Sequence, residues 1–283
     1  QQYGSDIFED TKHKQNHPEE TTKRNSAYTN VKQLLQLVSI KANFNLQAEV
    51  HRNYLSYAWW VLEPLLHMVI YYIVFGLLLN RGGENYPVFL LTGLIPWMWF
   101  TKAISSSSNS ILAGQNIMLQ VAVPSIYFPL VVLLQTTIKQ LPVFILLIGF
   151  VWLQGYPPEA HWWGLAPVLI VQAILTIALA CIVAAIIPFI RDLSYLVPTG
   201  LTFTMFLSGI FYDFKSIAAD WQDLFLLNPM AFLLKCYREI FIDGIMPDLT
   251  TLAWWGVGST ISCLLIIFAY QQLRYVYPRI VME

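Results

Sequence analysis

The residues that could do chemistry in this sequence are few, and they lie within long apolar stretches. Glu63 and His67 lie four residues apart, beside Pro64, so a helix would place them on one face. Lys139 lies in the middle of another apolar stretch. Ionisable groups are costly in hydrocarbon and usually face a protein interior or a water-filled cavity. These side chains therefore either line a passage for a hydrophilic cargo or form interhelical hydrogen bonds and snorkelling contacts.

The sequence carries none of the common catalytic or metal-binding motifs. It has no H-E-x-x-H, no G-x-S-x-G and no G-x-x-x-x-G-K-[ST] phosphate-binding loop. Cys181, Cys236 and Cys263 lie far apart in apolar stretches, which indicates buried small side chains rather than a metal site or a disulfide framework. We therefore expect no enzyme active site and no catalytic, cofactor-binding or metal-binding residue. Any work driven by ATP must come from a separate subunit.

The elements that must position these residues are membrane-spanning helices. Of the 283 residues, 57% are hydrophobic and 12% are charged, whereas a soluble domain carries roughly 25% charged residues. About 20 apolar residues cross a bilayer as a helix. The formal net charge of −1 suggests no nucleic-acid partner. We predict an all-α polytopic membrane protein with six spans, at about 57–79, 88–108, 126–153, 164–190, 194–211 and 252–273.

Two segments precede the first span. Residues 1–30 are polar and charged, and we predict a disordered cytoplasmic tail. In residues 31–55, apolar side chains including Leu35 and Val38 recur at helical spacing among Lys and Gln. This pattern predicts an amphipathic helix at the membrane surface, with an ordinary packed surface helix as the alternative.

Residues 213–250, between the last two predicted spans, hold two short apolar helices near 216–227 and 230–242. Pro229 disfavours a helical conformation at Asn228 and so separates them. Each helix is too short to cross a bilayer. We predict a re-entrant hairpin, which requires a turn that is buried or lines a water-filled cavity. An external loop with surface helices is the alternative.

The distribution of Lys and Arg predicts the orientation. Seven of them precede the first span, and Lys102, Arg191, Arg274 and Arg279 lie beside loops on the same side, whereas the opposite short loops contain only Arg81. By the positive-inside rule both termini are cytoplasmic, and the 213–250 hairpin faces outward.

Aromatic residues are dense in the predicted spans. Most are expected in interfacial belts or in helix packing. A minority are candidates to line a passage, where ring faces would stack on the C–H surfaces of sugars. The candidate lining residues are Trp59, Tyr71, Trp97, Phe203, Phe206 and Tyr212.

Six stretches, taken in order, resemble the membrane subunits of ABC transporters that export O-antigen, capsule and teichoic-acid polysaccharides. Two depart from the family pattern: Tyr57-Ala58 stands in place of Leu-Gly, and Gly209 in place of Pro. Each motif alone is weak, but their order over residues 31–283 is specific. The stretches are Arg52 to Leu65, Tyr86 to Trp97, Val123 to Pro129, Ile190 to Pro198, Ser208 to Tyr212, and Leu227-Asn228-Pro229 with Tyr237-Arg238 and Gly244.

The resemblance implies a partner set and a cargo. It implies a dimer of this chain with two copies of an ATP-binding subunit, which holds ATP and Mg²⁺. The cargo would be a glycan on an undecaprenyl-type lipid, exported through the bacterial inner membrane. The resemblance also places a coupling loop at 110–124 and a gate in the 213–250 hairpin. The residues implied in coupling are Gln115, Asn116, Arg191 and Asp192, and those implied in gating are Asn228, Pro229, Tyr237 and Arg238.

Three other functions fit part of the pattern. A permease of the same fold that exports a drug or a lipid would need a narrow apolar seam between its copies. An intramembrane acyl- or glycosyltransferase would need His, Asp or Arg clustered near one interface, and only scattered candidates exist. A membrane scaffold would leave the re-entrant hairpin without a role.

Overall fold

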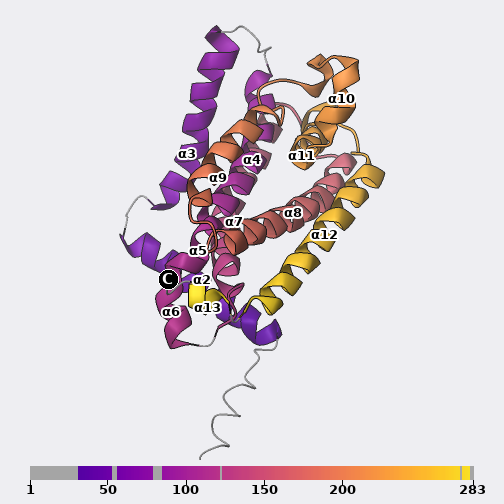
Figure 1. Ribbon diagram of the computed structural model, residues 1–283. Helices are drawn as coiled ribbons and strands as arrows, with labels where there is room; N and C mark the ends of the chain where they lie inside the picture. The colour runs from indigo at the N-terminus through magenta and orange to yellow at the C-terminus, as the bar shows by residue number, and fades with distance from the viewer. Residues whose placement is uncertain (1–30, 53–55, 79–84, 122, 275, 281–283) are drawn as a thin grey trace, which may run out of the picture. The chain divides into compact units, whose positions relative to one another are not determined.

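The computed structural model describes residues 31–52, 56–78, 85–121, 123–274 and 276–280. The predicted tail at 1–30 and the charged residue Arg81 lie outside this range. Every regular element in the described residues is helical (Figure 1). Residues from Val38 onward form one compact unit, and this unit is described below; the residues before it form a separate unit.

Among the described residues, five helices are long and apolar enough to cross a membrane. They coincide with five of the predicted spans, with boundaries that differ by a few residues. The first is α3 continued by the π-helical η1, and the fourth is the 3₁₀ turn η2 continued by α8. The helices are α3 (Ser56–Tyr71) with η1 (Tyr72–Leu78), α4 (Tyr86–Ser108), α7 (Tyr127–Leu153), η2 (Ala160–Gly164) with α8 (Leu165–Ile186), and α12 (Leu249–Gln272).

The predicted span at 194–211 is shorter than expected. Helix α9, Leu193–Phe206, has only 14 residues, which cover about 21 Å at 1.5 Å per residue. The chain then turns at Gly209, whose φ of +70° lies in the left-handed region that glycine tolerates. Because of this turn, Ile210 and Phe211 leave the helix direction and pack in the core.

The core is organised around α4, which packs against α7, α8, α11 and α3. The residues from Leu90 to Phe100 are all buried. Two glutamines from neighbouring helices donate hydrogen bonds to backbone carbonyls of α4. Gln140 Nε2 on α7 lies 3.2 Å from the Ile95 carbonyl oxygen, and Gln172 Nε2 on α8 lies 2.9 Å from that of Pro96. These bonds satisfy polar groups that are buried between the helices.

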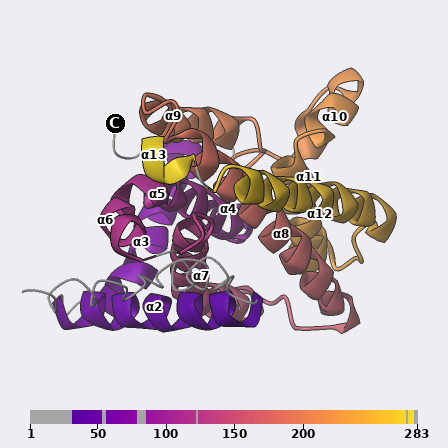
Figure 2. The ribbon, with the colours of Figure 1, turned by 60° about the horizontal axis from the view of Figure 1, so that its bottom comes forward.

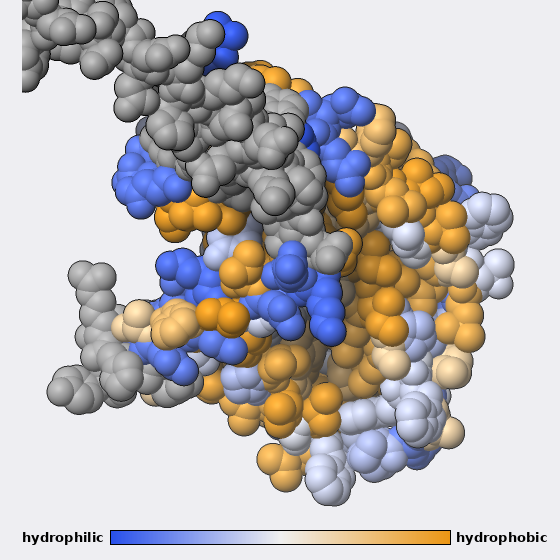
Figure 3. Space-filling model, turned by 90° about the horizontal axis from the view of Figure 1, so that it is seen from below, coloured by the Kyte–Doolittle hydropathy of each residue, from blue (hydrophilic) through white to orange (hydrophobic). Residues whose placement is uncertain are grey.

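The outer helices expose apolar side chains. Helix α12 packs along α8, and α3 packs along α4 and α7, on different sides of the central helices (Figures 1 and 2). Exposed side chains on α12 include Trp254, Ile261, Leu265 and Phe268. In the view along the bundle, a broad hydrophobic flank lies beside patches of hydrophilic residues (Figure 3). Such flanks suit contact with lipid chains.

The shorter elements lie before, between and after these helices. Residues 31–52 form one helix, α2, and its position at the membrane surface stays a prediction. The two short helices predicted between the last spans are present as α10 and α11. The remaining elements are α2 (Val31–Arg52), α5 (Ser110–Ala113), α6 (Gln115–Gln120), η3 (Phe214–Ser216), α10 (Ala219–Leu226), α11 (Pro229–Arg238), η4 (Glu239–Asp243) and α13 (Tyr277–Ile280).

Candidate translocation, gating and coupling sites

An aromatic cluster joins the end of α3 to the turn that follows α9. The Phe211 ring lies at its centre, 4.8 Å from the Tyr71 ring, 4.4 Å from the Phe75 ring and 5.5 Å from the Phe206 ring, measured between centroids. The Tyr212 hydroxyl donates to the Phe206 carbonyl oxygen at 2.8 Å. Three predicted lining residues, Tyr71, Phe206 and Tyr212, are thus brought together.

The other three predicted lining residues lie apart. Phe203 is 66% exposed on α9, and Trp59 is exposed near the start of α3. Trp97 is only 3% exposed and packs against Phe100 inside the bundle. Because α4 is the central helix, the Trp97 ring faces neighbouring helices of this chain, and its role in lining a passage stays a prediction.

Asn228 and Pro229 join α10 to α11 and attach the junction to α9. The Asn228 side chain caps α11 by accepting from the Met230 backbone N–H at 3.0 Å. Its Nδ2 donates to the Ser208 hydroxyl at 3.0 Å and to the Leu207 carbonyl oxygen at 3.3 Å. Pro229 occupies the first helical position, where its missing N–H costs nothing. The start of α11 is thereby fixed to the end of α9.

Tyr237 anchors the other end of α11 in the core. Its side chain is fully buried, and its hydroxyl donates to Gln172 Oε1 at 2.6 Å. Gln172 in turn donates to the Pro96 carbonyl oxygen. A continuous polar chain therefore links α11, α8 and α4. Because each member is buried, losing one partner would leave an unsatisfied group.

Arg238 holds the α9–α10 turn against α11. Its Nη1 donates to the Gly209 carbonyl oxygen at 2.7 Å and its Nη2 to that of Ile210 at 3.0 Å. The guanidinium carbon lies 3.6 Å above the Phe89 ring centroid. Burial lowers the pKa of Arg238 to about 10, while Asp213 acts in the opposite direction. The side chain is therefore charged at neutral pH, and it is held by backbone dipoles and a ring face.

The predicted coupling loop forms the short helices α5 and α6. Gln115 and Asn116 are both exposed at the start of α6. The preceding Gly114 is buried against Phe128, at the start of α7. Arg191 and Asp192 are exposed in the turn between α8 and α9. Because α5 contacts α8 and α6 contacts α13, this segment lies at the end of the unit that carries α13.

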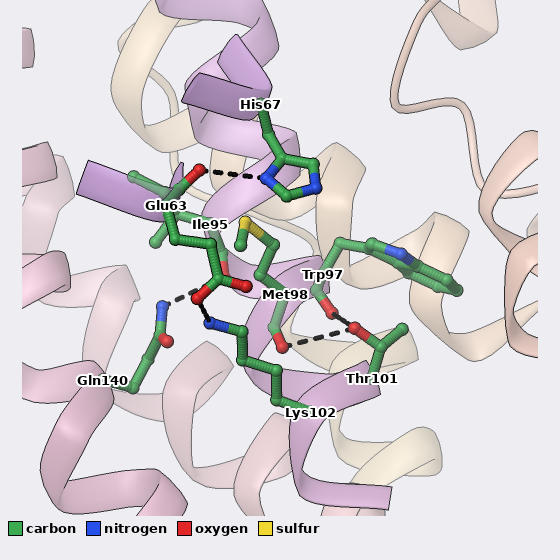
Figure 4. Close-up of polar contacts among 8 residues, drawn as sticks. All are labelled: Glu63, His67, Ile95, Trp97, Met98, Thr101, Lys102 and Gln140. Carbon is green, nitrogen blue, oxygen red and sulfur yellow. Dashed lines mark hydrogen bonds and ion pairs between the residues drawn. The ribbon is translucent and has the colours of Figure 1, made fainter. Parts of the chain in front are cut away.

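Glu63 pairs with Lys102 rather than with His67. The Glu63 carboxylate on α3 lies 2.5 Å from Lys102 Nζ on α4, and both side chains are partly exposed (Figure 4). His67 Nδ1 lies 2.9 Å from the Glu63 backbone carbonyl oxygen, within the same helix. The structure thus assigns Glu63 to an interhelical contact, one of the two alternatives that the sequence left open.

Lys139 is also paired. Its Nζ lies 2.5 Å from the Glu49 carboxylate on α2 and 5.6 Å from the centre of the Trp60 ring. The pair joins α2 to α7 and lies beside α3. Two ion pairs therefore connect α2 and α3 with the central helices.

We expect a double-mutant cycle to measure the contribution of the Glu63–Lys102 pair to the stability of the folded protein. Glu63→Gln and Lys102→Gln should each lower the thermal stability of the purified protein. The double variant, Glu63→Gln with Lys102→Gln, closes the cycle, and its loss should be smaller than the sum of the two single losses, because each single variant already breaks the pair. A coupling free energy of about 1 kcal/mol is expected for a partly exposed pair. A loss in the double variant equal to the sum of the two single losses would show that the pair contributes nothing.

Sequence reasoning missed two important residues. Gln172, which connects Tyr237 to α4, was not singled out, although it is the only amide side chain in α8. Phe211, which lies at the centre of the aromatic cluster, was not among the predicted lining residues. A lone amide side chain in an apolar span can be recognised from the sequence, so Gln172 could have been predicted. The position of Phe211 could not, because it depends on the turn at Gly209.

These features define a multi-pass helical membrane protein whose polar side chains serve mainly to join helices. The chain belongs to the ABC-2 type transporter family, which it matches over residues 38–242.

Three relatives show the range of similarity. The chain is 28% identical over 254 residues to the O-antigen export system permease protein RfbA of Klebsiella pneumoniae, covering 89% of this chain and 97% of the relative. It is 30% identical over 208 residues to the protein of that name from Myxococcus xanthus, covering 72% of this chain and 79% of the relative. It is 25% identical over 242 residues to the polysialic acid transport protein KpsM of Escherichia coli, covering 84% of this chain and 94% of the relative.

Proposed function

We propose that this chain is the membrane subunit of an ABC transporter that exports a lipid-linked polysaccharide across the bacterial inner membrane. O-antigen is the first candidate, and capsule or teichoic acid are the alternatives. One observation carries the proposal: the similarity to an O-antigen export permease extends over 97% of that protein's length. The chain itself acts without catalysis, and ATP hydrolysis takes place with Mg²⁺ in a separate subunit.

In this proposal α9 is the fifth of six spans and borders the passage. Its 14 residues include none that is buried, and the turn after it has irregular backbone. Irregular backbone at membrane depth is tolerated only where it is buried in protein or lines a water-filled cavity. The turn meets this rule by its own burial, so the support for a passage comes from α9, where Phe203 and Phe206 are exposed, and from Tyr212 next to them. A second copy of the chain would complete that passage, with two ATP-binding subunits below it.

The α10–α11 pair is proposed as the outward gate and the α5–α6 segment as the contact with the ATP-binding subunit. The links of Asn228, Tyr237 and Arg238 to α9, α8 and the turn at Gly209 support the first role. Exposure of Gln115 and Asn116 supports the second. ATP binding would then shift the equilibrium between closed and open passages through contacts that differ between the two states.

This function is tested by deletion of the gene in its native host. We expect loss of surface polysaccharide, together with accumulation of the lipid-linked glycan in the inner membrane. The wild-type gene should restore export only when the ATP-binding subunit is active. Normal surface polysaccharide in the deletion strain, with no accumulated intermediate, would refute the proposal.

Cysteine labelling tests the orientation. In a Cys263→Ser background, Asp223→Cys on α10 should react with a membrane-impermeant maleimide in intact spheroplasts. Gln115→Cys on α6 should react only after the membrane is opened. The background is suitable because Cys181 and Cys236 are buried. The reverse labelling pattern would invert the proposed topology.

Substitution of an exposed ring on α9 tests the passage. Phe203→Ala should reduce surface polysaccharide several-fold without loss of assembly, because a ring that contacts the moving glycan is removed. Phe268→Ala provides the matched control, since Phe268 is an exposed phenylalanine on α12. Equal export by both variants would place Phe203 in a lipid-facing role.

A further inference from the structure

A small cavity lies where the turn after α9 meets the end of α11 and η4. Its volume is about 80 Å³, which is room for several waters, since roughly 10–15 Å³ holds one. Three cationic and three acidic side chains line it, together with phenylalanine rings. The charged lining residues are Asp213, Lys215, Lys235, Arg238, Glu239 and Asp243.

The charges in this cavity balance, and their ion pairs are loose. Lys215 Nζ lies 3.4 Å from the Asp243 carboxylate, and Lys235 Nζ lies 3.6 Å from the Glu239 carboxylate. Charge-assisted hydrogen bonds between such groups are normally about 2.7–2.9 Å long. Each ammonium group has three donors, and each carboxylate has two oxygens able to accept more than one bond. These groups therefore keep capacity for further hydrogen bonds.

Aromatic rings hold two of the cations and supply apolar surface. Lys235 Nζ lies 4.9 Å from the centre of the Phe214 ring, and the Arg238 guanidinium lies over Phe89. Phe225 lines the same cavity, and its ring edge approaches the backbone of Gly209. The cavity thus presents ring surfaces beside paired donors and acceptors.

This combination selects a ligand class. A free anion would meet three carboxylates as well as three cations, so it gains little net attraction. An apolar ligand would strip water from six charged groups, which is costly. A neutral polyhydroxyl ring can donate to the carboxylates, accept from the ammonium groups and place its C–H surface on the phenylalanine rings.

We propose that this cavity is a subsite for one edge of a single neutral sugar residue of the exported glycan. The inference rests on the proposed function, and it places the subsite at the gate, between the α9 turn and α11. The site would hold the glycan beside Arg238, the residue that joins these two elements. Occupation of the cavity would therefore change the contact that Arg238 makes between the turn and α11.

Binding can be measured on the full chain with its ATP-binding subunit in nanodiscs. Saturation-transfer NMR would use methyl glycosides of glucose, galactose, mannose and N-acetylglucosamine as probes. Inorganic phosphate would be titrated in parallel as the anionic probe. The test variants are Asp243→Asn and Phe214→Ala. Asp223→Asn is the control, because Asp223 is an exposed carboxylate on the neighbouring α10 and does not line the cavity.

We expect at least one glycoside to bind, with affinity reduced five-fold or more in both test variants and unchanged in the control. Thermal unfolding of the variants would confirm that they fold. Binding of none of the glycosides, equal binding by all variants, or displacement of the sugar by phosphate would each overturn the proposal. These outcomes are distinct from failure of the proposed function, which the gene deletion measures without reference to the cavity.

Discussion

Replacement of Arg238 by Met is expected to lower the free energy of unfolding by about 3 kcal/mol and to abolish export. The variant keeps much of the side-chain volume but removes both donors to the Gly209 and Ile210 carbonyl oxygens. A hydrogen bond to a charged group contributes about 1.5–3 kcal/mol, and an acceptor left buried without a partner costs a similar amount. The α9–α10 turn would then be free to leave α11. The effect would be measured by thermal and denaturant unfolding in detergent and by surface polysaccharide in cells.

Two variants control this experiment. Arg238→Lys should give an intermediate loss, since one ammonium group cannot reproduce the planar fork that reaches both carbonyl groups. Arg279→Met removes an exposed arginine from α13 and should leave stability unchanged. If Arg238→Met were as stable and as active as the wild type, the role assigned to this side chain would be wrong.

Gly114→Ala is expected to impair the segment between α4 and α7. A Cβ atom at this position would lie 2.2 Å from two carbons of the Phe128 ring. The backbone has a φ of −86°, which alanine accepts, so the effect is steric. Overpacking of this kind costs about 1–3 kcal/mol. We expect lower thermal stability and weaker crosslinking of Gln115→Cys to the ATP-binding subunit, because α6 starts directly after this residue.

Gly258→Ala is the matched control. Gly258 is an exposed glycine inside α12, and an added Cβ meets nothing within 4 Å. Alanine is the better helix former by about 1 kcal/mol, so this variant should be neutral or slightly more stable. Equal behaviour of the two variants would show that Phe128 moves aside without cost.

Much of the secondary structure is predictable because apolar length and proline position act locally. Five spans follow from uninterrupted apolar runs, and the division between α10 and α11 follows from Asn228-Pro229. The length of α9 is not predictable in this way. Apolar residues continue to Tyr212, and only the turn at Gly209 ends the helix early. Apolar composition alone does not distinguish a residue that continues a helix from one that turns back into the core.

The candidate site was partly predictable. Asn228, Tyr237 and Arg238 were named from the sequence, whereas the contacts that they make were not predicted. Gln172 lies 65 residues from Tyr237 in the chain, and no local pattern connects them. The burial of Trp97 was not predictable either, because burial depends on which helix occupies the centre of the bundle.

The sequence by itself determined that this is a helical membrane protein, because apolar length and sparse charge leave no soluble alternative. It also identified the polar residues at the helix ends and beside the short helices. Only the tertiary structure decided which of these residues meet. Glu63 pairs with Lys102, Lys139 with Glu49, and Arg238 with the carbonyl groups of the α9–α10 turn. Pairing depends on how helices far apart in the chain pack together, and that packing is set by many small contacts over the whole bundle.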